Sequence, residues 1–144
     1  MMQHKQKISH GDIAWGEPNY TTDEVRQLQK RGEMFIAFDN KRVVATVSLA
    51  DSDTRIWGDD IAPALYIHKL AVDSSFSGKK IGEKLIEWAA TQAQEKGIYR
   101  LRLDCGGNVA GLCSYYERIG FIRVGTTTIE SYDGPVALFE KVLG

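Results

Sequence analysis

The stretch from His68 to Ile86 constrains the fold most, because it joins an apolar strand to an amphipathic helix through a glycine-containing turn. The apolar run ends at Val72, and Gly78 and Gly82 flank two lysines where the helix is expected to begin. A helix amino terminus presents unpaired N–H groups and a partial positive charge, and glycine lets an anion approach the backbone closely. The stretch therefore predicts a strand–turn–helix cradle for a pyrophosphate. The alternative is a tight turn and close helix packing without a ligand.

This cradle departs from two common nucleotide-binding motifs. A Walker loop requires a lysine and a hydroxyl residue directly after its second glycine, but Gly82 is followed by Glu83. A Rossmann fingerprint requires three glycines, and only two are present here. An enzyme that binds nucleotide phosphates through either motif is therefore disfavoured, and a magnesium dependence of ligand binding would revive that reading.

The periodicity of the remaining chain predicts a mixed α/β fold. Capping-box spacing predicts a helix that starts near Thr21 and ends before Gly32. Two further helices are predicted over about 79–96 and over 110–119. The predicted strands 34–38 and 43–50 are separated by a turn, which predicts an antiparallel hairpin. No repeat or linker interrupts the chain, which indicates a single domain over residues 1–144. The predicted strands are 34–38, 43–50, 64–72, 99–104, 121–128 and 136–142.

Composition narrows the class of protein. Hydrophobic residues make up 43% and charged residues 26% of the 144 residues, as in soluble globular domains. The net charge of -1 argues against a nucleic-acid partner. Cys105 and Cys113 have the spacing of neither a zinc knuckle nor a Cys-x-x-Cys pair, so we expect free thiols and no metal. No signal region or membrane-length apolar run is present, which predicts a cytoplasmic protein with no membrane partner.

Two motifs, in this order, resemble the GNAT superfamily of N-acetyltransferases. The first is Leu70-Ala-Val72 followed by Ser77-Gly-Lys-Lys-Ile-Gly82, and the second is Tyr115-Tyr-Glu-Arg-Ile-Gly-Phe121, with Asn108 between them. The resemblance covers roughly residues 34–142. It implies the GNAT-like acyl-CoA N-acyltransferase fold, an α/β (α+β) mixed sheet. It also implies acetyl-CoA as co-substrate, no metal, and direct transfer of the acetyl group in a ternary complex to a primary amine of a small molecule or peptide.

The chain departs from the family pattern in several places. Ser77 stands where the family has arginine or glutamine, and Lys80 stands where it has the first glycine of Gly-x-Gly. We expect Lys80 to adopt an ordinary helical conformation. Asn108 lies one position early, with Val109 at the expected place. The family's first strand and long first helix are not evident before Thr21, which predicts a reduced or partner-completed amino terminus and leaves a homodimer open.

The resemblance implies a set of cofactor-binding residues. The pantetheine arm of acetyl-CoA would lie along residues 70–72, with the Leu70 N–H polarising the thioester carbonyl. The pyrophosphate would bind the N–H groups at the start of the helix. The implied cofactor-binding residues are Leu70, Ala71, Val72, Gly78, Lys79, Lys80, Ile81, Gly82 and Asn108.

Tyr116 matches the family's general-acid tyrosine. A phenol titrates near ~10, so it is protonated at neutral pH and can donate a proton to the departing thiolate. The alternative is an aromatic ring that only packs under a helix end.

His68 is the best candidate base. Alternation along the strand predicts that it shares a face with Leu70 and Val72, and the family resemblance extends to a histidine at this place. Imidazole titrates near ~6.5 and can relay a proton through water. The alternative is a half-buried strand histidine bonded to a carbonyl. Asp51, Asp53 and Trp57 precede this strand and are either substrate-facing or ordinary loop residues.

A rival from a different class is a module of the same fold that binds acyl-CoA without turning it over. The departures at Ser77 and Lys80 leave room for it, whereas Tyr116 and His68 argue against it. Release of CoA with a panel of amines would distinguish the enzyme from the module. The sequence does not identify the acceptor amine.

Overall fold

The computed structural model describes residues 5–7, 30, 32–39, 42–59, 62–76 and 80–144. The chain forms two compact units, Met1–Leu49 with Ile67–Ala89, and Ala50–Tyr66 with Ala90–Gly144. The strand β4 (Leu65–Val72) and the helix α3 (Ile81–Glu95) each contribute residues to both units.

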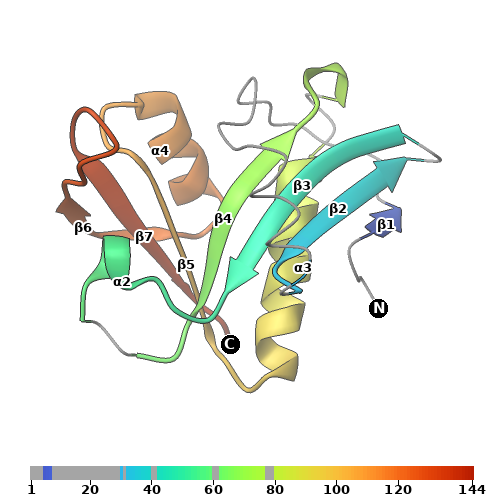
Figure 1. The fold of residues 1–144 in the computed structure, drawn as a ribbon, viewed down its shortest axis with the longest axis horizontal. Coiled ribbons are helices and arrows are strands. Elements are labelled where there is room, and N and C mark those ends of the chain that lie inside the picture. Colours follow the sequence, from blue (N-terminus) through green and yellow to red (C-terminus); the bar gives the residue numbers. More distant parts are fainter. Residues whose placement is uncertain (1–4, 8–29, 31, 40–41, 60–61, 77–79) are drawn as a thin grey trace. The chain divides into compact units, whose positions relative to one another are not determined.

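The first unit is built around an antiparallel hairpin. Its strand order is β1-β2-β3-β4, with β1 parallel to β2 and β2 antiparallel to β3 (Figure 1). The predicted hairpin is therefore confirmed, and it includes a register shift between Ala37 and Phe38. The elements that lie entirely in this unit are β1 (Lys5–Lys7), β2 (Met34–Asp39) and the 3-10 helix η1 (Ser74–Phe76). The strand β3 (Arg42–Ala50) also lies in this unit, except for its last residue.

The amino-terminal strand that the sequence does not reveal is present as β1. Its three residues, Lys-Gln-Lys, carry no apolar pattern, and the strand is defined by backbone pairing of Lys5 with Ile36 and Lys7 with Phe38. The first strand is therefore present in reduced form, with three residues. The helix predicted from Thr21 lies outside the described residues, apart from Lys30, which is helical, and Gly32 follows with a φ of 72°.

The helical periodicity of α3 is confirmed by its burial. Ile81, Leu85 and Ala89 recur at helical spacing and are each at most 1% exposed. The ring of Trp88 meets Phe35 of β2 edge to face, with centroids 4.8 Å apart. Burying apolar surface in this way contributes roughly 25 cal/mol per Å². The apolar stripe of α3 therefore packs into the core of the first unit.

The second unit contains strands in the order β4-β5-β7-β6. Residues Leu65 and Tyr66 of β4 pair in parallel with β5, whereas β7 is antiparallel to both of its neighbours. Phe139 of β7 is fully buried. The other elements of this unit are α2 (Thr54–Trp57), β5 (Arg100–Gly106), α4 (Ala110–Arg118), β6 (Ile122–Thr127) and β7 (Val136–Val142).

The helix α2 replaces part of the polar loop that the sequence predicts. Asp53 caps it, because one carboxylate oxygen accepts a hydrogen bond from the Ile56 N–H at 3.3 Å. Trp57 ends the helix and meets the ring of Tyr66 with centroids 5.8 Å apart. One turn is too short to produce a readable helical period, so α2 was missed.

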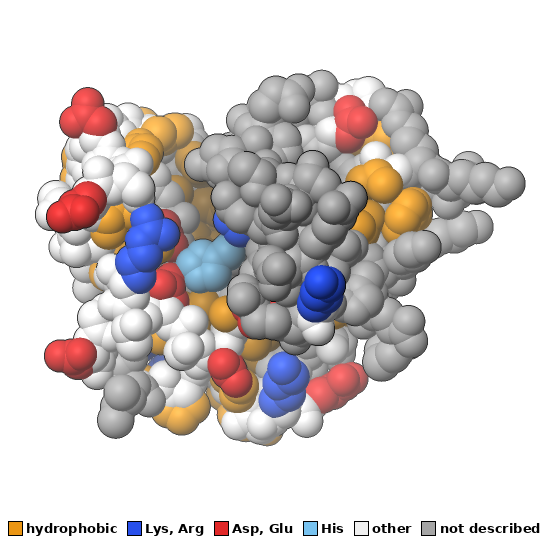
Figure 2. Space-filling view, viewed as in Figure 1, with side chains coloured by type: hydrophobic (Ala, Val, Ile, Leu, Met, Phe, Trp, Pro, Cys, Tyr) orange, Lys and Arg blue, Asp and Glu red, His pale blue; other side chains and the backbone are white. Residues whose placement is uncertain are grey.

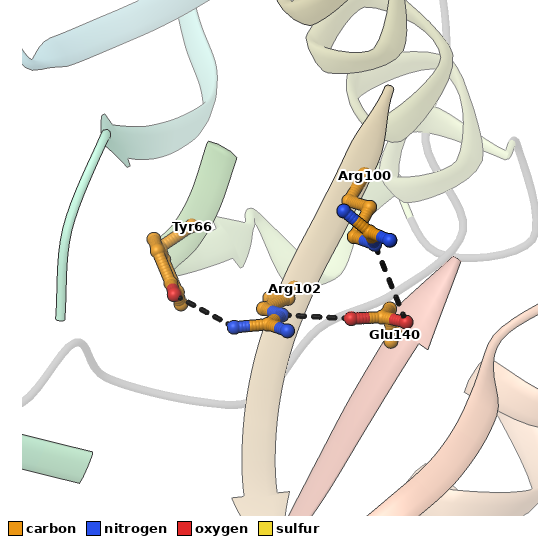
Figure 3. A network of polar contacts seen from close by, with 4 residues as sticks. All are labelled: Tyr66, Arg100, Arg102 and Glu140. Atoms are coloured by element: carbon orange, nitrogen blue, oxygen red, sulfur yellow. Dashed lines mark hydrogen bonds and ion pairs between the residues drawn. The ribbon is translucent and has the colours of Figure 1, made fainter. Parts of the chain in front are cut away.

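A buried arginine joins strands of the second unit, and Figure 3 shows its contacts with Tyr66 and Glu140. Arg102 is 4% exposed, and its Nε lies 2.8 Å from a carboxylate oxygen of Glu140 while Nη1 donates to Tyr66 Oη at 2.9 Å. Its guanidinium also lies 4.4 Å from the ring centroid of Trp57. A buried charge is tolerated only when it is paired and hydrogen-bonded in this way. Arg102 therefore positions Trp57, and with it α2, over the sheet.

The described surface carries charges of both signs. In Figure 2 basic and acidic side chains are interspersed among the coloured residues of the visible face. Among the helices that the structure describes, none is long and apolar enough to cross a bilayer.

Candidate active site

The end of β4 is held by hydrogen bonds within the first unit. The Asp73 N–H donates to the Val44 carbonyl of β3 at 2.8 Å. The Asp73 carboxylate accepts from the Ser75 N–H at 3.0 Å and from the Ser75 hydroxyl at 2.9 Å. This turn leads into η1, where Phe76 is buried. The direction of the chain after Val72 is therefore set by backbone and side-chain bonds together.

The helix α3 starts one residue after a left-handed lysine. Lys80 has a φ of 63°, and its carbonyl accepts the first helical bond, from the Lys84 N–H at 3.1 Å. The expectation of an ordinary helical Lys80 is therefore wrong. The backbone keeps the conformation that glycine favours, although the glycine of the family pattern is missing. Ile81 and Gly82 follow and are buried, while Gly78 and Lys79 lie outside the described residues.

We expect Lys80→Gly to stabilise the protein. A side chain in the left-handed region costs roughly 1–2 kcal/mol, and the added chain entropy of glycine offsets roughly 0.5–1 kcal/mol of that gain. The same change at Lys84, which is exposed inside α3, should instead destabilise by about 1 kcal/mol. Denaturant unfolding of the two variants should show opposite signs. Equal destabilisation would contradict a strained Lys80.

A second left-handed residue interrupts β4 itself. Lys69 has a φ of 53°, and its carbonyl accepts a hydrogen bond from Thr46 Oγ1 of β3 at 3.3 Å. Alternation of side chains requires extended backbone, so it does not pass through Lys69. The shared face predicted for His68 and Leu70 therefore no longer follows from their spacing. His68, Leu70 and Ala71 are half-buried, and Val72 is buried.

Tyr116 lies in the aromatic core of the second unit. Its ring meets Tyr115 at 5.4 Å, and meets Phe121 and Phe139 at 5.9 Å each, measured between centroids. After α4 ends, Gly120 adopts a φ of 104°, and the Phe121 N–H donates to the Tyr116 carbonyl at 3.0 Å. The Tyr-Glu-Arg-Ile-Gly-Phe motif therefore turns the chain back so that its last ring packs on its first.

Burial raises the pKa of Tyr116 far above its ordinary value, and the neighbouring Cys105 and Tyr115 raise it further. The side chain is 5% exposed, so removal of the phenolate from water is the main cause. Tyr116 therefore holds its proton across the neutral and mildly alkaline range. This is the protonation state that a general acid requires.

Asn108 forms a contact that sequence reasoning did not anticipate. Its side-chain oxygen accepts a hydrogen bond from Tyr132 Oη at 3.3 Å. The Tyr132 ring lies over Gly106, where a Cβ would collide with its hydroxyl. The Gly107 N–H also donates to the Pro135 carbonyl at 2.8 Å. Asn108 therefore helps to hold the β6–β7 loop against the end of β5, and only the glycine pair before it could have signalled such a close approach.

The predicted site residues fall into two groups. His68, Leu70, Ala71, Val72, Lys80, Ile81 and Gly82 belong to the first unit, which joins the end of β4 to the start of α3. Tyr116 and Asn108 belong to the second unit, as do Asp53 and Trp57 of the α2 region. Within the second unit, Asp53 caps a helix and Trp57 stacks on Arg102, so both have structural roles. Asp51 is exposed.

The chain matches a known protein family over most of its length. The acetyltransferase (GNAT) family matches residues 3–121, which include the β4–α3 segment and the Tyr116 motif. The chain belongs to this family. The resemblance stated from the two motifs is therefore confirmed, as is the mixed α/β fold.

A relative in sequence supports the family assignment, and solved structures share the fold. The uncharacterized N-acetyltransferase YesJ of Bacillus subtilis (strain 168) is 32% identical over 101 residues, which are 67% of this chain and 56% of YesJ. The chain thus spans little more than half of that relative. A GNAT-family acetyltransferase from Listeria monocytogenes has a TM-score of 0.72 at 23% identity, covering 86% of this chain and 72% of that one. A Bacillus subtilis acetyltransferase in complex with CoA has a TM-score of 0.69 at 18% identity, covering 88% and 87%.

Proposed function

We propose that residues 1–144 act as one domain that transfers an acetyl group from acetyl-CoA to a primary amine of a small molecule or peptide. The observation that carries this proposal is the β4–turn–α3 segment, with glycine-like backbone at Lys80, inside a family match over residues 3–121. Turnover with pools of amines tests it. The solved relative that holds CoA supports the choice of cofactor.

The start of α3 fits the pyrophosphate of CoA. The first N–H groups of a helix have no carbonyl partner within the helix, and they carry partial positive charge. Gly82 adds no side chain there, and the exposed Lys80 adds a cation. In this proposal the pyrophosphate accepts from the N–H groups of residues 78–82. The pantetheine arm pairs with backbone groups of residues 70–72, and the Leu70 N–H polarises the thioester carbonyl.

The reaction needs two proton movements. The neutral amine nitrogen attacks the thioester carbonyl carbon, the carbon–sulfur bond breaks, and the nitrogen gives up a proton. We assign proton removal from the amine to His68 through water, and protonation of the leaving thiolate to Tyr116. Burial keeps the Tyr116 hydroxyl protonated before the thiolate forms, and the same raised pKa makes it a weaker acid toward that thiolate.

We expect His68→Ala to alter the pH dependence of turnover without abolishing cofactor binding. An imidazole base loses its function when protonated, so the wild-type rate should fall toward acid pH. The variant should lack this limb and respond to added free imidazole. Turnover from pH 5.5 to 8.5 and calorimetric titration with CoA provide the measurements. An unaltered pH–rate profile would remove His68 from the mechanism.

An acyl-CoA-binding module without turnover is the second candidate, favoured by Ser77 and Lys80 at two positions of the cofactor motif. Tight CoA binding with no CoA release from any amine would establish it. We further propose that the protein acts in the cytoplasm without nucleic-acid, membrane or metal partners. Formation of a homodimer stays a prediction, which light scattering can test.

A further inference from the structure

Two thiols meet in the second unit at a place that the proposed mechanism does not use. Cys105 lies on β5 and Cys113 on α4, and their sulfur atoms are 3.6 Å apart. They are 8% and 7% exposed, respectively. The Cys113 thiol also lies 3.6 Å from the Gly106 carbonyl, which it can reach as a donor. The fold therefore brings together two thiols that are separated by only a short turn in the sequence.

The geometry is close to that of a disulfide. An S–S bond is about 2.05 Å long, so closure requires the two sulfurs to approach by about 1.5 Å. Cys113 lies in the first turn of α4, just after Val109, which is 43% exposed. The Cys113 N–H bonds to the Val109 carbonyl at 3.1 Å, so this turn begins at the surface. A small movement of the start of α4 toward β5 would bring the two sulfurs closer together.

We propose that Cys105 and Cys113 form a redox modification site, in which a peroxide or disulfide oxidant converts the two thiols into an intramolecular disulfide. With hydrogen peroxide, one thiol sulfur attacks a peroxide oxygen, which gives a sulfenic acid and one water. The second sulfur then displaces the hydroxyl as another water, and the S–S bond forms. Two thiols and one peroxide thus give one disulfide and two waters.

The order of the two steps follows from the surroundings of each sulfur. Burial, followed by the hydrogen bond with Cys113, raises the pKa of Cys105 to about 12. Cys105 therefore remains a thiol at neutral pH, and a thiol is a poor nucleophile. Opening of the first turn of α4 at Val109 exposes Cys113 rather than the strand residue. Cys113 is thus oxidised first, and the slower attack of the Cys105 sulfur on the Cys113 sulfenic acid completes the disulfide.

Cys113 of this redox site lies on the same helix as Tyr116. Cys113 and Tyr116 are three residues apart on α4 and therefore lie on one face of the helix. Tyr116 is packed tightly between Phe121 and Phe139, so a shift of α4 toward β5 alters its placement. We expect the disulfide to lower turnover reversibly. This effect on turnover rests on the proposed function, whereas formation of the disulfide does not.

Counting thiols tests the site directly. The full chain is treated with hydrogen peroxide or oxidised glutathione, denatured, alkylated and analysed by mass spectrometry. The Cys105→Ser and Cys113→Ser variants are treated in the same way, after circular dichroism has shown that they fold. Wild type should lose both thiols together, with the mass of two hydrogens, and regain them with reductant. The Cys105→Ser variant should instead gain oxygen or glutathione at Cys113, and Cys113→Ser should react more slowly. Retention of both thiols, stepwise addition of oxygen, or links between chains would overturn the proposal.

Activity separates this site from the proposed function. If an amine substrate is found, oxidised wild type should release CoA at least about tenfold more slowly than reduced protein, with little change in CoA affinity. Oxidised and untreated Cys113→Ser should have equal rates. A disulfide with unchanged turnover would overturn the coupling to Tyr116 alone. Failure of every amine would contradict the proposed function, and the thiol count would still decide the redox site.

Discussion

Replacing Tyr116 by phenylalanine is expected to lower turnover by about 10²-fold or more, the usual scale of general acid catalysis. The substitution keeps the ring that packs on Phe121 and Phe139 and removes only the proton donor. The fold should survive, because one hydroxyl contributes only ~1 kcal/mol through its hydrogen bond. Affinity for acetyl-CoA should change little. Steady-state turnover with one confirmed amine is the measurement, together with a calorimetric titration.

Tyr115→Phe is the matched control. Tyr115 is equally buried, and its ring lies 5.4 Å from that of Tyr116, but it is not the tyrosine that the family motif assigns as the acid. Its loss of a hydroxyl should therefore have a much smaller effect. Because burial raises the pKa of Tyr116, its hydroxyl should stay protonated near pH 10. Wild-type turnover should therefore not fall near pH 10 through ionisation of Tyr116. A Tyr116→Phe variant that works at wild-type rate while chemistry limits turnover would remove the assignment.

Replacing Gly82 by valine is expected to weaken CoA binding tenfold or more, a loss of about 1.4 kcal/mol. Gly82 is buried in the first turn of α3, where the N–H groups proposed for the pyrophosphate lie. A branched side chain there crowds the approach to those groups. Calorimetric titration of the folded variant gives the affinity, and its thermal melt shows whether overpacking has changed stability.

Lys84→Val controls for the added valine. Lys84 is exposed two residues further along α3, so the same side chain enters the same helix away from the anion site. Its affinity for CoA should stay within about twofold of wild type. Unchanged affinity in a folded Gly82→Val variant would instead show that CoA binds elsewhere.

Elements with a strong apolar period could be predicted from the sequence. Ile81, Leu85 and Ala89 mark the buried side of α3, and alternating residues mark the hairpin of β2 and β3. These signals are local, since burial of one face imposes the period on neighbouring residues. The strand β7 was predicted with the bounds Val136–Val142 that the structure shows.

Other features depend on contacts or dihedral angles that no local pattern reports. The strand β1 is polar and exists through its pairing with β2. The left-handed conformations of Lys69 and Lys80 place ordinary residues where glycine is favoured. The ion pair of Arg102 with Glu140 and the meeting of Cys105 with Cys113 are set by the sheet and by α4. Such tertiary contacts could be found only once the fold was known.

The most direct test of acetyl transfer is incubation of the full chain with acetyl-CoA and pools of amines. Free CoA thiol and acetylated products are measured together, by a thiol reagent and by mass spectrometry. We expect at least one pool to yield CoA and an acetylated amine in equal amounts, and we expect Tyr116→Phe to slow the formation of both about 10²-fold. Tight binding of CoA without release of thiol from any pool would contradict acetyl transfer and establish a binding module instead.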